Sequence, residues 1–282
     1  MTIGNYTIRT IETGDFGLDG GAMFGVVPKN LWSKVYNPGD EQNRIPMSAR
    51  CLLITSPDGR TILVDTGCGT KLSEKLQSIY KIDYSHNTLL GSLAAHGVKP
   101  EDVTDVILTH LHFDHAGGAT HFENGEAIPT FSKAKYYVQK DHLAWARNPT
   151  EKDRASFFKE NWEPIISAGM MEILDGDGEI FKGISVQQFH GHTKALQMVK
   201  ILDGETTLIF PADVFPTSAH IPVPFVMGYD NYPLTAIDEK RGLLPSIADE
   251  QWIVCFEHDA FVPAGRIIRT EKGFALGEKV AL

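Results

Sequence analysis

The sequence predicts an α/β protein made of two sheets packed face to face, with helices outside. Three observations predict it. Apolar, β-branched segments typical of strands recur in both halves of the 282 residues. Hairpin turns and helical patterns alternate with them, which favours mixed sheets covered by helices. Residues with metal-binding chemistry directly follow several of the strands, where α/β proteins commonly place their sites. We expect one domain, residues 1–282.

The first half contains both element types in the order strand, strand, strand, helix, helix, strand. The turn Ser56-Pro57-Asp58-Gly59 joins two apolar segments into a β-hairpin. Gly97, with Pro100 beyond it, closes the second helical pattern. The predicted strands are 6–11, 51–55, 61–64 and 102–109, and the predicted helices are 71–79 and 88–95.

The second half repeats the mixture of hairpins and helices. Its predicted strands are 135–138, 171–174, 184–189, 198–202, 207–210 and 252–256, and its predicted helices are 140–147, 154–168 and 235–248. Two stretches lack a regular pattern, residues 19–47 and 215–233, and both are rich in Gly or Pro and in aromatic residues. Loops of this length inside a compact domain are commonly functional. The second is expected to form either a lid or an aromatic cover over the edge of the core. The first is an insertion that serves either as an entrance lid or as the contact of a homodimer.

Charge and hydropathy exclude several classes of partner. The chain has 26 basic and 36 acidic residues, a formal charge of -10, which opposes attraction to nucleic acid or to an anionic membrane surface. No segment has the roughly 20 apolar residues that cross a bilayer, and residues 1–10 lack the pattern of a signal peptide. We therefore expect a cytoplasmic protein that acts on a small molecule.

The run His110-Leu111-His112-Phe113-Asp114-His115 concentrates four potential metal ligands in six residues. Imidazole nitrogens and carboxylate oxygens are the ligands that zinc and similar divalent metals prefer. A single histidine would more often be structural, but this density reverses the expectation. On an extended or loop backbone, residues two apart point the same way, so the spacing suits two adjacent ions better than one. Gly117 and Gly118 allow a tight backbone path beneath the run.

Further ligands are needed to surround two ions, and three follow other predicted strands. His192 comes after the strand ending near residue 189, Asp213 after 207–210, and His258 after 252–256. Each alone is a weak signal, but together with the histidine run they form a constellation at strand ends. We therefore predict a metal centre with ligands from both halves of the sequence.

These motifs, with Leu63-Val64-Asp65-Thr66-Gly67, Gly191-His192-Thr193 and Ala212-Asp213, resemble the metallo-β-lactamase superfamily over nearly the whole chain. The resemblance implies a four-layer αβ/βα sandwich with two divalent metal ions. Zinc is the expected metal, and manganese, iron and cobalt are alternatives. It implies that His110, His112 and His192 hold one ion and that Asp114, His115 and His258 hold the other. It also implies that Asp213 bridges both ions and that Asp65 orients a ligand from behind, although Asp65 could instead be a turn residue.

The resemblance further implies a hydrolase in which a bridging hydroxide attacks a carbonyl or phosphoryl centre, with Asp114 or Asp213 returning a proton to the leaving oxygen. Residues 18–29 look like the branch containing the N-acyl homoserine lactonases and methyl parathion hydrolase, so a lactone or another ester is the expected substrate. Those lactonases have a tyrosine three residues after the bridging aspartate, where this chain has Pro216. The expected substrate contacts are His220, Phe225 and Tyr229, with Tyr232 as another potential donor.

Two alternatives remain open at this point. The substrate could be a phosphotriester or a thioester. The metal site could also serve binding or redox chemistry without hydrolysis. The redox relatives of this superfamily replace the second histidine of the run with glutamate, whereas His112 is present here. Structural zinc sites are usually closed and rich in cysteine, unlike this set of histidines and aspartates. Both comparisons favour hydrolysis.

Overall fold

The computed structural model describes all residues from 1 to 282 and divides into two compact units. Unit one consists of Met1–Asp15 and Ala49–Gly176, and unit two consists of Phe16–Ser48 and Asp177–Leu282. Each unit is built on a seven-stranded mixed sheet with helices. The predicted α/β class with two mixed sheets is therefore confirmed, whereas the boundaries of a single domain stay a prediction. No helix is both long enough and apolar enough to span a bilayer.

The sheet of unit one has the strand order β1-β2-β3-β4-β5-β8-β9, and β2 and β3 extend into the residues of unit two. Its strands are β1 (Thr2–Ile3), β2 (Tyr6–Asp19), β3 (Arg44–Thr55), β4 (Thr61–Val64), β5 (Asp105–Ile107), β8 (Lys135–Gln139) and β9 (Met171–Leu174). The hairpin predicted around residues 56–59 is the antiparallel pair β3–β4. From β4 to β9 the strands are parallel, so their carboxyl ends lie at one edge.

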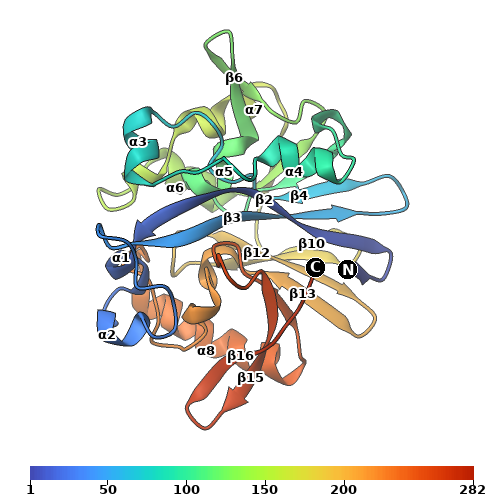
Figure 1. Cartoon of the computed structure of the whole chain (residues 1–282). Helices are drawn as coiled ribbons and strands as arrows, with labels where there is room; N and C mark the ends of the chain where they lie inside the picture. Colours follow the sequence, from blue (N-terminus) through green and yellow to red (C-terminus); the bar gives the residue numbers. More distant parts are fainter. The chain divides into compact units, whose positions relative to one another are not determined.

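Five helices accompany this sheet: α3 (Glu74–Ile79), α4 (Leu89–Ala95), α5 (Phe113–Ala116), α6 (Lys140–Arg147) and α7 (Glu163–Ser167). They lie on one face of it, with the small hairpin of β6 (Thr120–Glu123) and β7 (Glu126–Pro129) beyond them (Figure 1). Thr88 caps α4, its hydroxyl accepting from Gly91 N. The core beneath them includes Leu63, Val106 and Trp162, each fully buried. This packing fixes the ends of β4 and β5.

The sheet of unit two has its strands in sequence order, from β10 to β16. They are β10 (Gly178–Phe181), β11 (Ile184–Phe189), β12 (Leu196–Asp203), β13 (Thr206–Phe210), β14 (Ile253–Cys255), β15 (Ala264–Thr270) and β16 (Gly273–Lys279). The long helix α8 (Pro233–Asp249) contacts β15. Because β13 and β14 are parallel and β11 is antiparallel to β12, which is antiparallel to β13, the strands β11, β13 and β14 all end at one edge.

One predicted helix, 154–168, is wrong. In its place lie two short 3-10 turns, Arg154–Ser156 and Lys159–Asn161, followed by α7. Phe157 between them is extended, forms a bridge with His112 and is 9% exposed. The chain gains more from burying Phe157 and Trp162 than from a continuous helix, so tertiary packing overrides the local pattern.

An aromatic contact joins the two irregular stretches, because the rings of Phe24 and Phe225 lie 6.2 Å apart. Residues 19–47 include two short helices, α1 (Gly20–Phe24) and α2 (Lys29–Trp32), and the rings of Phe24 and Trp32 stack at 5.0 Å. The second stretch, 215–233, has one 3-10 turn at Ser218–His220 and then irregular backbone up to α8. Asp230 near its end is 5% exposed. Phe215 and Ile221 are buried as well, so part of the stretch packs within unit two.

Candidate metal centre

The histidine run of unit one begins three residues after the end of β5, at the edge where β4 also ends. Asp65 follows β4 directly and is held to β5 by the bond from its N–H to Ile107 O, 2.9 Å. Its backbone is left-handed, with φ +59°, a conformation that aspartate tolerates better than most residues. The parallel pair β4–β5 therefore brings Asp65 and His110–His115 together, as the strand-end argument predicts.

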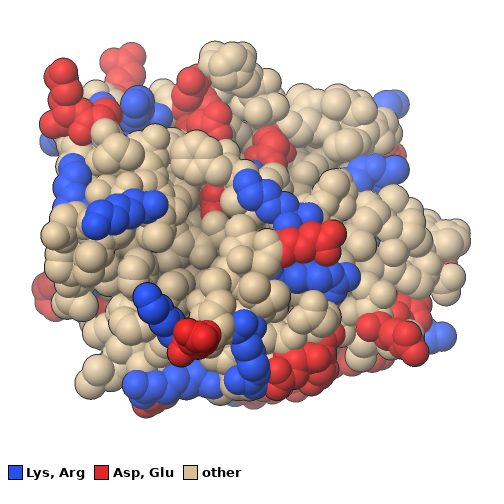
Figure 2. Space-filling model, turned by 60° about the horizontal axis from the view of Figure 1, so that its bottom comes forward, with Lys and Arg blue, Asp and Glu red and all other residues tan.

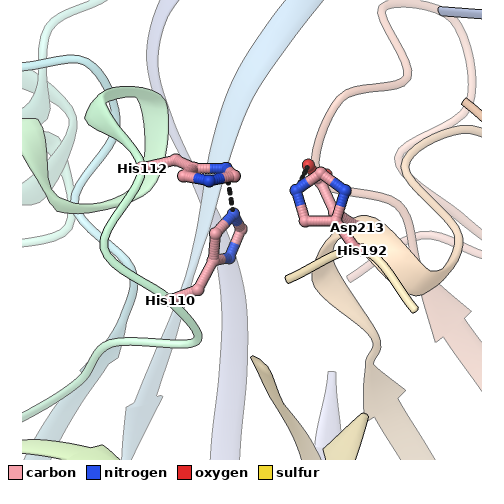
Figure 3. Close-up of side chains that lie close together, drawn as sticks. All are labelled: His110, His112, His192 and Asp213. Atoms are coloured by element: carbon pink, nitrogen blue, oxygen red, sulfur yellow. Dashed lines mark hydrogen bonds and ion pairs between the residues drawn. The ribbon is translucent and has the colours of Figure 1, made fainter. Parts of the chain in front are cut away.

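His110 and His112 face each other through ring nitrogens. His110 Nε2 lies 3.1 Å from His112 Nδ1, and both side chains are buried (Figure 3). The Thr109 hydroxyl donates to Asp65 Oδ2 over 2.6 Å, so it accepts from His110 Nδ1 at 3.1 Å. This relay places the proton of a neutral His110 ring on Nδ1 and leaves the Nε2 lone pair directed at His112.

Asp65 also holds His115. The distance from His115 Nδ1 to Asp65 Oδ2 is 3.1 Å, while His115 Nε2 faces Asp114 Oδ2 at 3.9 Å. One buried carboxylate thus positions His115 directly and His110 through Thr109. Such partners fix the tautomer and the ring orientation of ligating histidines.

The glycines after the run let a second backbone segment approach closely. A Cβ built on Gly117 would lie 2.0 Å from Cys68 O, and one built on Gly118 would lie 2.3 Å from Thr66 O. The predicted tight path beneath the run is therefore present. It seats the loop after Asp65 against the helix that carries Asp114 and His115.

The remaining three candidates lie together in unit two, each just beyond a strand. His192 follows β11, Asp213 follows β13 and His258 follows β14. Asp213 Oδ2 lies 3.1 Å from His192 Nε2 (Figure 3), and Asp213 Oδ1 lies 3.2 Å from His258 Nε2. The carboxylate thus lies between two imidazoles and turns a different oxygen to each.

The other nitrogen of each of these rings is already engaged. His258 Nδ1 donates to Ser48 O over 3.0 Å, and His192 Nδ1 lies 3.0 Å from Asp230 Oδ1. A carbonyl only accepts, so a neutral His258 ring carries its proton on Nδ1 and presents a lone pair at Nε2. Lone pairs facing carboxylate oxygens repel each other unless a cation lies at the contact. The donor set therefore fits a divalent metal.

Sequence reasoning missed several supporting residues. Asp230 holds His192, Ser48 holds His258, and His142 Nε2 accepts from the N–H of Leu111 inside the run at 2.8 Å. The sequence offers a weak signal for His142 only, because it lies on a predicted helix beside a buried strand. Ser48 acts through its carbonyl, which carries no sequence signal at all.

The three substrate-contact candidates differ in exposure. Tyr229 is 37% exposed and Phe225 is half-buried. His220 is 1% exposed, its Nε2 donates to Met23 O over 2.8 Å, and its Nδ1 accepts from Thr217 Oγ1 over 2.7 Å. Its ring also stacks on Phe24 at 4.6 Å. Both nitrogens of His220 are therefore used within the protein in this arrangement.

Another aromatic residue, not singled out from the sequence, lies beside the run. The Tyr80 ring stacks on Phe113 at 4.5 Å. Burial raises the pKa of Tyr80, and the negative charge of Asp114 raises it further. The phenol therefore keeps its proton at neutral pH and is a hydrogen-bond donor near the ligand run.

The chain matches characterised families over most of its length. Residues 44–258 match the family described as the metallo-beta-lactamase superfamily. An N-acyl homoserine lactonase of Bacillus cereus is 26% identical over 230 residues, which are 77% of this chain and 83% of the relative. Another N-acyl homoserine lactonase, AiiB of Agrobacterium fabrum, is 32% identical over 164 residues, 51% of this chain and 58% of that protein. The relatives are hydrolases, as predicted.

Solved structures agree with this match. A probable metal-dependent hydrolase from Staphylococcus aureus is 30% identical, with a TM-score of 0.87 over 100% of both chains. The dizinc quorum-quenching lactonase AidC is similar in fold, with a TM-score of 0.83 and 19% identity over 100% of this chain and 97% of that one. With the ligand motifs at two strand edges and a family match over three quarters of its residues, the chain belongs to the metallo-beta-lactamase superfamily.

Proposed function

We propose that this protein is a hydrolase that uses two divalent metal ions and acts on a lactone or another ester. His110, His112 and His192 would hold one ion, Asp114, His115 and His258 the other, and Asp213 would bridge them. The observation that carries the proposal is the Asp213 carboxylate, whose two oxygens face two different imidazoles at 3.1 and 3.2 Å. Zinc suits this set of nitrogen and oxygen ligands, and manganese, iron or cobalt could replace it.

The residues divide the work of hydrolysis among them. Two bound ions would supply a water of lowered pKa and polarise the acyl oxygen, so that no nucleophilic serine or cysteine is needed. The seven candidate ligands and Asp65 would fix the positions of the two ions. Each ligand is buried, and the rings of His115, His192 and His258 each contact a second protein group through Nδ1. Asp114, through Oδ2, or Asp213 would return a proton to the leaving oxygen.

A cavity next to the ligand run supports a substrate with an apolar arm. It has a volume of about 270 Å³ and lies in unit one between α3 and residues 158–161. Its lining includes the apolar residues Leu72, Leu76 and Phe158 and the charged residues Lys71 and Glu160. The ring of Phe158 lies 6.2 Å from that of Phe113 inside the run. Such a mixed lining suits an amphipathic small molecule such as an acylated lactone.

Surface charge supports a small substrate over nucleic acid. Figure 2 shows Lys and Arg side chains interspersed with Asp and Glu across one face of the molecule, without a wide area of one sign. The formal charge is -10. A nucleic-acid enzyme would be expected to carry a basic stripe along its binding face.

Pro216 favours a second candidate function, the hydrolysis of phosphotriesters or thioesters. The branch of lactonases described above has a tyrosine at this position, and this chain lacks it. Tyr229 is the proposed replacement donor because its side chain is exposed at the end of the predicted lid. Phe225 would form an apolar contact.

The test is a hydrolysis panel with the metal-loaded protein and His112→Ala. Wild type should hydrolyse at least one of the classes lactone, ester, phosphotriester and thioester, and His112→Ala should lower that rate by about 100-fold or more, because a ligand is lost. A folded, metal-loaded wild type that hydrolyses none of them would refute the proposal.

A further inference from the structure

Helix α8 holds a lysine that is almost completely buried. Lys240 is 2% exposed and makes no ion pair. Its ammonium group donates to three backbone carbonyls, His220 O at 2.5 Å, Pro222 O at 2.9 Å and Phe225 O at 2.9 Å. A lysine ammonium has three hydrogens, so all of them are used.

Burial of this cation is expensive, which implies a role that an apolar residue could not fill. Taking an ammonium group out of water costs several kcal/mol unless polar partners compensate. Burial accordingly lowers the pKa of Lys240 to about 7. A methionine would fill the same space without this cost, but it could not hold three carbonyls together. Lys240 therefore serves to hold the backbone segment that contains these three carbonyls in place.

The far end of that segment, residues 220–230, contacts the candidate metal ligand His192. Past Phe225, the N–H of Met227 donates to Asp230 Oδ2 over 2.9 Å, and Asp230 Oδ1 lies 3.0 Å from His192 Nδ1. The N–H of Asn231 also donates to His192 O over 2.9 Å. A short series of contacts thus runs from the ammonium group to the ring of His192.

The preceding residue on α8 reaches His192 by a second route. The carboxylate of Glu239 accepts from His190 N at 2.5 Å and from Gly191 N at 3.0 Å, the two residues before His192. A Cβ on Gly191 would lie 2.4 Å from the Cα of Ala236, so this backbone lies directly on α8. Adjacent helical side chains diverge by about 100°, so the pair can brace His192 from two directions.

We propose that Lys240 and Glu239 are positioning residues for His192, with Lys240 acting through residues 220–230 and Asp230 and Glu239 acting through the backbone at 190–191. The inference rests on the proposed function, because it takes His192 to be a metal ligand. It adds that the affinity for the ion held by His192 depends on a buried lysine that touches neither ion nor substrate.

The test is a double-mutant cycle read out as metal affinity, measured by competition with a chelator. Asp230→Asn should weaken metal binding by about 10- to 100-fold, the usual cost of losing the partner behind a ligating histidine. Lys240→Met should weaken it by about tenfold. If Lys240 acts through Asp230, the double variant should bind no more weakly than Asp230→Asn alone. Glu239→Gln should weaken metal binding by a further factor in either background, because it acts through a separate route.

The matched control is Lys200→Met. Lys200 lies on β12 in the sheet of unit two, with its ammonium group 3.9 Å from the centre of the Trp252 ring. Its replacement should leave metal affinity unchanged. Wild-type affinity in folded Lys240→Met, or additive losses in the double variant, would overturn the proposal.

A measurement on the wild type alone covers the case in which Lys240→Met does not fold. Since coupling is reciprocal, metal loading should slow hydrogen exchange of the backbone amides in residues 225–231. Unchanged exchange there would also overturn the inference. Neither readout depends on turnover, so a protein that binds metal normally but hydrolyses nothing would refute the proposed function and leave this inference standing.

Discussion

Asp65 Oδ2 lies 3.1 Å from His115 Nδ1, and both side chains are fully buried. The same oxygen accepts from the Thr109 hydroxyl, which in turn meets His110. One residue after β4 therefore orients two candidate ligands that follow β5. Asp65 also has the left-handed backbone of a turn residue. The two roles considered for it, turn residue and partner of a ligand, are therefore compatible.

Asp65→Asn should weaken metal binding by about 10- to 100-fold and lower kcat/KM, because the amide is a poorer acceptor for His115 and for the Thr109 hydroxyl. Chelator competition measures the affinity. Asp58→Asn, in the exposed β3–β4 turn, is the matched control and should behave as wild type. Equal affinities in the Asp65 and Asp58 variants would show that Asp65 has no role in orienting ligands.

Gly117→Ala should lower the free energy of unfolding by about 3 kcal/mol, because the new Cβ would lie 2.0 Å from Cys68 O, a backbone atom. Gly242→Ala is the control. Gly242 is exposed within α8 and has nothing within 4 Å of a built Cβ, so alanine should raise stability by about 0.5–1 kcal/mol. Urea unfolding of both variants checks the pair, and a neutral Gly117→Ala would contradict the close approach.

Stability should fall on acidification through His220. Burial, with a smaller contribution from the nearby Lys240 charge, lowers the pKa of His220 to about 4. The unfolded chain, with its ordinary pKa near 6.5, then binds more protons than the folded one between about pH 6.5 and pH 4. Stability is therefore lost as pH falls through that window, by about 3 kcal/mol at most from this residue.

His220→Gln removes the titrating group and should flatten this part of the pH dependence. The measurement is urea unfolding of both proteins at several values between pH 7 and pH 4. Identical slopes in wild type and variant would mean that folding does not lower the pKa of His220, contrary to the burial of its ring.

Tyr229→Phe should lower turnover by about tenfold or more and leave metal content intact, if its phenol replaces the tyrosine of the lactonases as a donor to the substrate carbonyl. Tyr137→Phe is a suitable control, because its phenol donates to Asp105 at the start of β5 and away from the ligand edge. Full activity in Tyr229→Phe would assign the donor to another residue, with Tyr232 and Tyr80 the next to change.

The candidate ligands could be identified from the sequence because their signals are local. His110–His115 lie within six residues, and His192, Asp213 and His258 each follow an apolar strand. The parallel pairs β4–β5 and β13–β14 then bring strand ends to one edge in each unit. Neither step needs knowledge of side-chain packing.

Supporting residues could not be predicted, because their roles arise only from contacts between distant segments. Asp230 lies 38 positions from His192 and on irregular backbone. Lys240 sits in a helix among charged residues, where a lysine normally points to solvent, yet its ammonium is buried under three carbonyls. The wrong helix 154–168 has the same cause, since the burial of Phe157 beside His112 decides the backbone there.

The central claim is that two ions bound by this chain carry out hydrolysis, and metal stoichiometry measured alongside activity tests it most directly. Elemental analysis of carefully reconstituted protein should find two divalent ions per chain. Hydrolysis should disappear on chelation and return when both equivalents are restored. One ion or fewer at full activity, or activity that survives complete removal of metal, would contradict the account.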